Sequence, residues 1–425
     1  MLETLRNAWK VEDLRKKLIF TLLMIVVFRL GAAIPVPFLD KQAIQAALEG
    51  TNLGIMDFLN MLTGQGFSNP SIFSMSIYPY ITASIIIQLL TIAIPYLEEL
   101  SKEGEEGKKK IARFTKIGAV FIAIVQAVAT SQAFFKQGIV AQGTLENIVL
   151  IMTMVAGTMI LVWIGELITE RGVGNGISLI ILIGIISGLP GLAISWTQQM
   201  LAGVLNPVKV ILFAILAILI TAWVVMIAEG QRKIPVQYAK RVVGRKMYGG
   251  QATHLPVKVN MAGVMPVIFA SSLLSLPQIL TLFISNEGAT NFITEYLTLN
   301  GTAGVWIYSI LQILLIILFA YFYTAIQFNT VEYAKNLQQQ GGFIPGIRPG
   351  RSTGDYLQRV SNRITFIGAI SLAILATLPL LLSLIFNLGV RFGGTSILIV
   401  VGVIIETVKQ IEAQLMMRHY KGFLR

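Results

Sequence analysis

The sequence predicts an all-α polytopic membrane protein with ten transmembrane helices. Of its 425 residues, 55% are hydrophobic and only 13% are charged, which is far from the composition of a soluble globular protein. The stretch from Phe58 to Leu97 contains no Lys, Arg, Asp or Glu, and this excludes a soluble enzyme. The chain has no cysteine and only two histidines, His254 and His419. It therefore has no disulfide framework and little material for a zinc or redox site, and we expect no cofactor.

Ten segments are long and apolar enough to cross the hydrocarbon core as helices, which takes about 20 residues at a rise of about 1.5 Å per residue. The leader before the first span contains Glu3, Glu12 and Asp13, which argues against a cleaved secretory signal. We expect the ten spans at residues 18–37, 71–95, 117–137, 148–168, 177–196, 208–228, 261–285, 305–330, 364–387 and 393–414.

The distribution of Lys and Arg predicts that both termini are cytoplasmic, because basic residues accumulate in cytoplasmic loops. With the N-terminus inside, all but five of the 33 basic residues fall on the cytoplasmic side. The opposite orientation would reverse this bias. The five residues on the outer side are Arg29, Lys41, Lys136, Lys209 and Arg391.

Five spans precede the outward loop near residues 188–207 and five follow it, so we expect two halves, residues 1–196 and 197–425. Since each half has an odd number of spans, the second half is inverted relative to the first. Inverted halves commonly meet around a central pathway.

The segment 54–70 is too short to cross the membrane. Four of its apolar residues share one face of a short amphipathic helix. This helix either lies on the outer leaflet or is a re-entrant segment buried in the protein. The four residues are Ile55, Phe58, Leu59 and Leu62.

Two long cytoplasmic loops, residues 229–260 and 331–363, carry many of the basic residues. Their charge is consistent with contact to anionic membrane lipids. Their length, together with basic residues mixed with glycine and aromatic residues in the run 238–246, favours docking of a large acidic or RNA-rich partner. A transporter of small solutes has less need of such loops.

Ionisable residues inside the spans are few and lie mostly near the span ends, with Glu406 the deepest. This weakens the alternative of a ten-span secondary transporter, which usually needs carboxylates or histidines at membrane depth. A membrane enzyme is disfavoured for the same reason. Uncharged polar residues within the spans, such as Thr82, Gln88, Thr324 and Gln327, usually form hydrogen bonds between helices.

Five runs, in order along the chain, resemble the SecY/Sec61 family of protein-translocation channels, and the resemblance covers essentially the whole sequence. Each run falls on an expected span or loop. The runs are YPYITASIIIQLL at 78–90, EGE with KKKI within 103–111, TERGVGNG at 169–176, HLPVKVNMAG at 254–263 and GFIPGIRPG at 342–350.

The resemblance implies a passive polypeptide channel with an hourglass pore between the two halves, and no enzymatic activity of its own. A pore that passes chains of any sequence without leaking ions is better sealed by an apolar constriction than by a charged site. Without the family, the implied constriction residues would be ordinary bundle core or lipid-facing residues. By resemblance the pore ring is Ile81, Ile85, Ile181, Ile185, Ile268 and Ile399.

The resemblance also assigns two moving parts. The segment 54–70, with Asp57 beside its four apolar residues, resembles a plug that fills the outer funnel at rest. The second, third, seventh and eighth spans would form a lateral gate through which hydrophobic segments leave into lipid. The polar residues expected at this gate are Thr82, Gln88, Asn260, Thr324 and Gln327.

The implied partners are SecE and SecG as small membrane subunits, the SecA motor or the ribosome on the cytoplasmic side, and signal peptides and nascent polypeptides as passengers. The implied location is the bacterial plasma membrane. Arg348 is the leading docking candidate, because the turn 345–350 holds its guanidinium on a stiff loop. The other docking candidates are Arg241, Arg245, Lys246 and Arg351.

Overall fold

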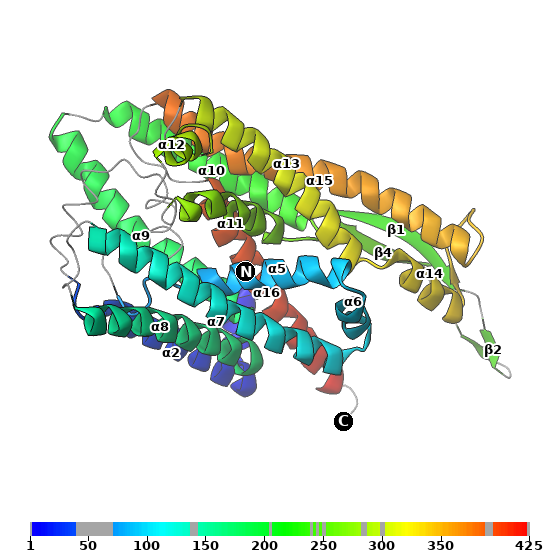
Figure 1. Cartoon of the computed structure of the whole chain (residues 1–425). Helices are drawn as coiled ribbons and strands as arrows, with labels where there is room; N and C mark the ends of the chain where they lie inside the picture. The colour runs from blue at the N-terminus through cyan, green and yellow to red at the C-terminus, as the bar shows by residue number, and fades with distance from the viewer. Residues whose placement is uncertain are drawn as a thin grey trace.

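The computed structural model describes residues 2–39, 71–136, 143–203, 206–238, 241–243, 246–248, 252–281, 287–297, 302–386 and 394–422. In this part of the chain, long helices form a bundle, and a small β-sheet lies at one end of it (Figure 1). The predicted plug, residues 54–70, lies outside the described residues.

Each expected span coincides with a helix. Six of the described helices are long and apolar enough to cross a membrane, and a seventh span results if one bent helix pair is counted. The all-α fold is confirmed, whereas the count of ten crossings and the orientation stay predictions. The ten helices are α2 (Glu12–Ala33), α5 (Tyr78–Ala93), α7 (Glu105–Lys136), α8 (Thr144–Arg171), α9 (Gly176–Leu201), α10 (Pro207–Glu229), α11 (Met265–Leu280), α13 (Thr302–Gln327), α15 (Arg351–Phe386) and α16 (Gly394–Gly422).

The second span differs from the expected continuous helix over residues 71–95. Ser71 forms an isolated β-bridge with Pro35, residues 72–77 form turns, and α5 ends at Ala93. The chain then bends by 100° into α6 (Pro95–Lys102). Pro95 explains the bend, because a proline disfavours helical backbone in the residue before it, and Ile94 is accordingly extended, with φ −110° and ψ 113°.

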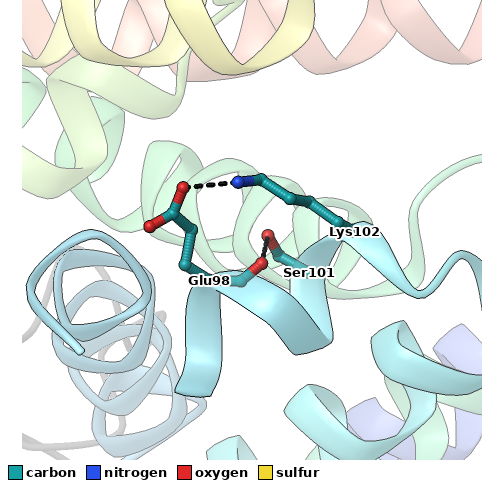
Figure 2. A network of polar contacts seen from close by, with 3 residues as sticks. All are labelled: Glu98, Ser101 and Lys102. Carbon is teal, nitrogen blue, oxygen red and sulfur yellow. Dashed lines mark hydrogen bonds and ion pairs between the residues drawn. The ribbon is translucent and has the colours of Figure 1, made fainter. Parts of the chain in front are cut away.

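Helix α6 is amphipathic and presents its charged side to water. It buries Leu97 and Leu100. On its exposed side the Glu98 carboxylate turns toward the Lys102 ammonium at 2.6 Å, and the Ser101 hydroxyl donates to the Glu98 carbonyl at 2.7 Å (Figure 2). Such an exposed pair stabilises a helix by only about 0.3–0.5 kcal/mol. It therefore contributes little to the stability of the fold and indicates which side of α6 is exposed.

The main core of the bundle is a cluster of buried apolar side chains with members on α2, α5, α8, α9, α10, α11, α13, α15 and α16, and a smaller cluster joins α7 to α8. Large apolar side chains also cover the outside of the bundle: Leu30 on α2, Phe121 on α7, Ile218 on α10 and Ile310 on α13 are all more exposed than buried. An outer surface of this kind suits lipid rather than water.

The two long basic loops, expected as separate loops, fold together into one unit, which we call the basic-loop unit. In it β1 (Gln231–Tyr238) pairs antiparallel with β4 (Ala252–Lys258), and β5 (Gly342–Phe343) of the second loop adds to the other edge of β1. The remaining elements are the hairpin β2 (Arg241–Val243) and β3 (Lys246–Tyr248), and α14 (Thr330–Gln339).

A small apolar core of its own holds the basic-loop unit together. Ile234 and Val236 of β1 pack with Val257 of β4, Leu337 of α14 and Leu357 of α15, all of them buried. Figure 1 shows β1, β4 and α14 projecting beyond one end of the bundle, while the short helix α12 (Glu287–Tyr296) lies at the other end. The remaining short helix, α1 (Leu2–Lys10), packs on α2 and α16.

Candidate functional site

The six isoleucines predicted as a pore ring are all buried, with exposures between 2% and 7%. They all belong to the single central core cluster. Helices from both halves of the chain contribute them. Four of them form two pairs with the spacing i, i+4, which places the members of each pair on one helix face. The six are Ile81 and Ile85 on α5, Ile181 and Ile185 on α9, Ile268 on α11 and Ile399 on α16.

Two cavities are lined by members of the central core cluster. The smaller, of about 180 Å³, is lined by Ile81, Ile181 and Ile268 together with polar side chains that include Gln88 and Asn175. The larger, of about 560 Å³, also reaches Asn175 and extends to the end of β4 at Lys258. Asn175 and Met265 line both cavities, so the two lie side by side between the end of β4 and the isoleucines of the smaller cavity.

The start of α9, in the run 169–176, is fixed by its own polar groups. The Asn175 side-chain oxygen accepts hydrogen bonds from the backbone N–H groups of Ile177 at 3.1 Å and Ser178 at 3.3 Å, which caps the helix. A Cβ at Gly176 would lie 1.9 Å from the Gly165 carbonyl oxygen. Glycine is required there because α8 and α9 approach too closely for a side chain.

Polar contacts cross the predicted gate between the two halves. The Tyr323 hydroxyl of α13 donates to the Gln88 side-chain oxygen of α5. The Tyr78 hydroxyl of α5 donates to the Ser272 carbonyl of α11 at 3.1 Å and contacts the Ser275 hydroxyl. Sequence reasoning missed these two tyrosines and two serines. The available signal was that a buried tyrosine hydroxyl needs a hydrogen-bond partner.

The other predicted gate residues have different surroundings. The Thr82 hydroxyl donates to a carbonyl of its own helix at 3.1 Å, and Thr324 is buried. The Asn260 amide donates to the Gly263 carbonyl at 3.0 Å and shapes the approach to α11, where Gly263 has φ +63°. Gln327 lines the larger cavity. Among the described contacts of the five predicted residues, Gln88 therefore forms the hydrogen bond that crosses the predicted gate.

Arg348 lies exposed in the turn between β5 and α15. Gly346 and Gly350 adopt φ +82° and +98°, a backbone region that glycine enters without strain. The Ile347 N–H donates to the Ile344 carbonyl at 3.0 Å, which tightens the turn. The sequence pattern thus produces a constrained loop that presents the guanidinium to solvent.

The other docking candidates lie in the same unit. Arg351 is exposed at the first residue of α15. Arg241 and Lys246 belong to strands β2 and β3, and Arg245 lies outside the described residues.

The ionisable groups near the larger cavity are partly paired. The Lys409 ammonium lies 3.2 Å from the Glu229 carboxylate and donates to the Ala228 carbonyl at 3.3 Å. Glu406 lines the cavity and is exposed. Within the described ranges, no three His, Cys, Asp or Glu side chains come together as metal ligands.

Comparison with known proteins agrees with this architecture. The family model SecY matches residues 71–408. The protein translocase subunit SecY of Halalkalibacterium halodurans is 45% identical, and the alignment covers all of both chains.

Two solved structures share the fold. A protein conducting channel superimposes with a TM-score of 0.68 at 21% identity, covering 94% of this chain and 92% of the other. Sec61 in the canine ribosome-channel complex superimposes with a TM-score of 0.63 at 19% identity, with the same coverage. The family model matches most of the chain, and the Halalkalibacterium halodurans protein is 45% identical over its full length. The protein is therefore a multi-pass membrane protein that belongs to the SecY family of protein translocase subunits.

Proposed function

We propose that this chain is the central channel-forming subunit of a protein translocase, and that unfolded secretory polypeptides cross the membrane between its two halves. The observation that carries the proposal is the cluster of six isoleucines. It draws on helices of both halves and borders the smaller cavity, which shares Asn175 and Met265 with the larger cavity next to the basic-loop unit.

The chemistry of the cluster suits a seal around a moving chain. Isoleucine side chains have no hydrogen-bonding groups, so a narrow ring of them is poorly wetted and resists ions. Such a ring also makes no specific demand on the polypeptide that displaces it. In this proposal Ile81, Ile181 and Ile268, which border the smaller cavity, are the first part of the ring that the chain meets from the cytoplasm.

The proposed lateral exit lies between α5 and α7 on one side and α11 and α13 on the other. The hydrogen bonds of Gln88 with Tyr323 and of Tyr78 with Ser272 cross this seam. A hydrophobic segment that enters the seam replaces two hydrogen bonds and some apolar contacts. The seam can therefore open for a sufficiently apolar segment without unfolding either half.

The rival function is transport of a small solute. The ionisable residues that line the larger cavity are Glu406, Lys409 and Lys258, and Lys258 belongs to β4 of the basic-loop unit. The spans lack the central carboxylate or histidine relay typical of coupled transporters. This favours the channel.

We assign the partners by family and by charge. SecE and SecG would complete a membrane heterotrimer, and SecA with ATP, or a translating ribosome, would drive the chain through. Arg348 and Arg351, exposed on the basic-loop unit, would contact the motor or the ribosome. Anionic lipids would bind the remaining basic residues on that side. In this proposal the basic-loop unit and both termini lie in the cytoplasm of a bacterial cell, and residues 54–70 act as the plug.

The function is tested by reconstitution. The chain is purified with SecE and SecG, placed in lipid vesicles, and supplied with SecA, ATP and a secretory precursor. We expect protease-protected precursor to accumulate only with ATP. Failure to protect any precursor, combined with saturable uptake of a small solute by the same vesicles, would overturn the proposal in favour of the transporter.

A further inference from the structure

Glu406 of α16 occupies a special position relative to the isoleucine cluster. It lies seven residues after Ile399, which is two helical turns, so the two side chains share one face of α16 at a separation of about 10 Å along the axis. Gln410, one turn further, lines the same cavity. The carboxylate is therefore the charged group of α16 nearest the isoleucine cluster on the side of the basic-loop unit.

The neighbouring charges leave this carboxylate available. Lys409, three residues further along α16, contacts Glu229 and the Ala228 carbonyl instead. Glu406 has no hydrogen bond or ion pair with any described residue, and it is the acidic residue among those that line the larger cavity. Its side chain is exposed and open to a passing group.

The other polar groups on the cavity wall are mostly uncharged. Asn175, Asn260, Gln327 and Gln410 contribute carboxamides, while Lys258 at the end of β4 and Lys409, which is paired with Glu229, contribute cations. Carboxamides can donate to or accept from any passing backbone, so they do not discriminate between passengers. Glu406 is therefore the group on this wall that can attract a positive charge, with Lys258 opposing it toward the basic-loop unit.

We propose that Glu406 binds the ammonium or guanidinium group of a basic residue that flanks a hydrophobic segment entering the channel, and so favours passengers with a positive flank on the cytoplasmic side. This inference rests on the proposed function. An extended chain covers about 3.3–3.6 Å per residue, so with the apolar segment at the isoleucine cluster, a basic residue about three positions away reaches Glu406.

The expected effect is modest and short-ranged. An exposed ion pair of this kind contributes up to about 1 kcal/mol, or roughly fivefold in a ratio of rates. Screening at physiological salt limits the range of the attraction between the two charges to about 8 Å. This distance corresponds to two or three residues of extended chain. Basic residues placed far from the apolar segment should therefore gain nothing from Glu406.

The test uses the reconstituted translocase and three precursors that differ only at the third residue outside the apolar segment, which is Lys, Gln or Glu. The measured quantity is the ratio of the initial translocation rates of the Lys and Gln precursors, so a general loss of activity cancels. We expect Glu406→Gln to reduce this ratio about threefold to fivefold, and Glu406→Lys to favour the Glu precursor. Glu412→Gln is the matched control, because Glu412 lies on the same helix, outside the cavity lining, and accepts from Thr4 at 3.0 Å.

Equal ratios in the wild type, Glu406→Gln and Glu406→Lys, in vesicles that translocate all three precursors, would overturn the inference and leave the proposed function intact. A ratio that falls as much in Glu412→Gln would also overturn it, because the effect would then follow net charge. If the wild type translocates none of the three precursors, the proposed function itself fails.

Discussion

Removing the Tyr323 hydroxyl should loosen the seam between α5 and α13. Tyr323→Phe keeps the ring, including its edge contact with Phe269 at a centroid distance of 5.2 Å, and deletes the hydrogen bond to Gln88. A neutral hydrogen bond contributes about 1 kcal/mol net, so the equilibrium between joined and separated helices should shift about fivefold toward separation. Because the chain has no cysteine, fluorophores at Leu89→Cys and Ile326→Cys can report the two populations by energy transfer in single complexes.

Tyr321→Phe is the matched control for this measurement. Tyr321 lies on the same helix, but its hydroxyl donates to the Asn362 carbonyl of α15 at 3.3 Å, within the same half. Its removal should leave the populations unchanged. The reasoning is refuted if Tyr323→Phe leaves the populations at the wild-type values, or if both variants shift them equally.

Three further changes have defined outcomes. Ile268→Asn places a hydrogen-bonding group in the isoleucine cluster, so the ion leak of reconstituted vesicles, measured as conductance, should rise severalfold; an unchanged leak would count against the seal. Gly176→Ala drives a Cβ to 1.9 Å from the Gly165 carbonyl and should lower the unfolding free energy by roughly 1–3 kcal/mol in thermal denaturation, whereas Gly188→Ala on the same helix meets nothing within 4 Å and should not. Arg348→Ala should weaken ribosome binding and lower its salt slope by about one, measured by co-sedimentation at several salt concentrations; binding with an unaltered slope would remove Arg348 from the contact.

The parts of the site that follow helical periodicity could be predicted from the sequence. Ile81 with Ile85, and Ile181 with Ile185, share helix faces by their spacing, and the structure buries all four in one cluster. The pairing of Gln88 with Tyr323 could not be predicted, since it joins residues 235 positions apart. Such a contact depends on how each helix is rotated about its axis, and the apolar pattern of a lipid-embedded helix leaves this rotation open.

The strands of the basic-loop unit were missed for a different reason. β1 buries Ile234 and Val236 on one side, and this alternation is a strand signal. The charge of the surrounding loop obscured it. β5 has only two residues and is defined by its partner strand, so no local pattern could reveal it. The second span ends at Ala93, two residues before the expected boundary, because Pro95 restricts the backbone of the residue before it.

The central claim is that a translocating polypeptide passes through the isoleucine cluster. The most direct test places one cysteine at Ile268 and another in a secretory precursor stalled during translocation, in a chain that has no native cysteine. Ile218→Cys on the outer surface of α10, where the native side chain is 69% exposed, is the lipid-facing control. We expect a disulfide with Ile268→Cys only while the precursor is stalled, and none with Ile218→Cys. Absence of the Ile268→Cys adduct in vesicles that demonstrably translocate, or equal adducts at both positions, would contradict passage through the cluster.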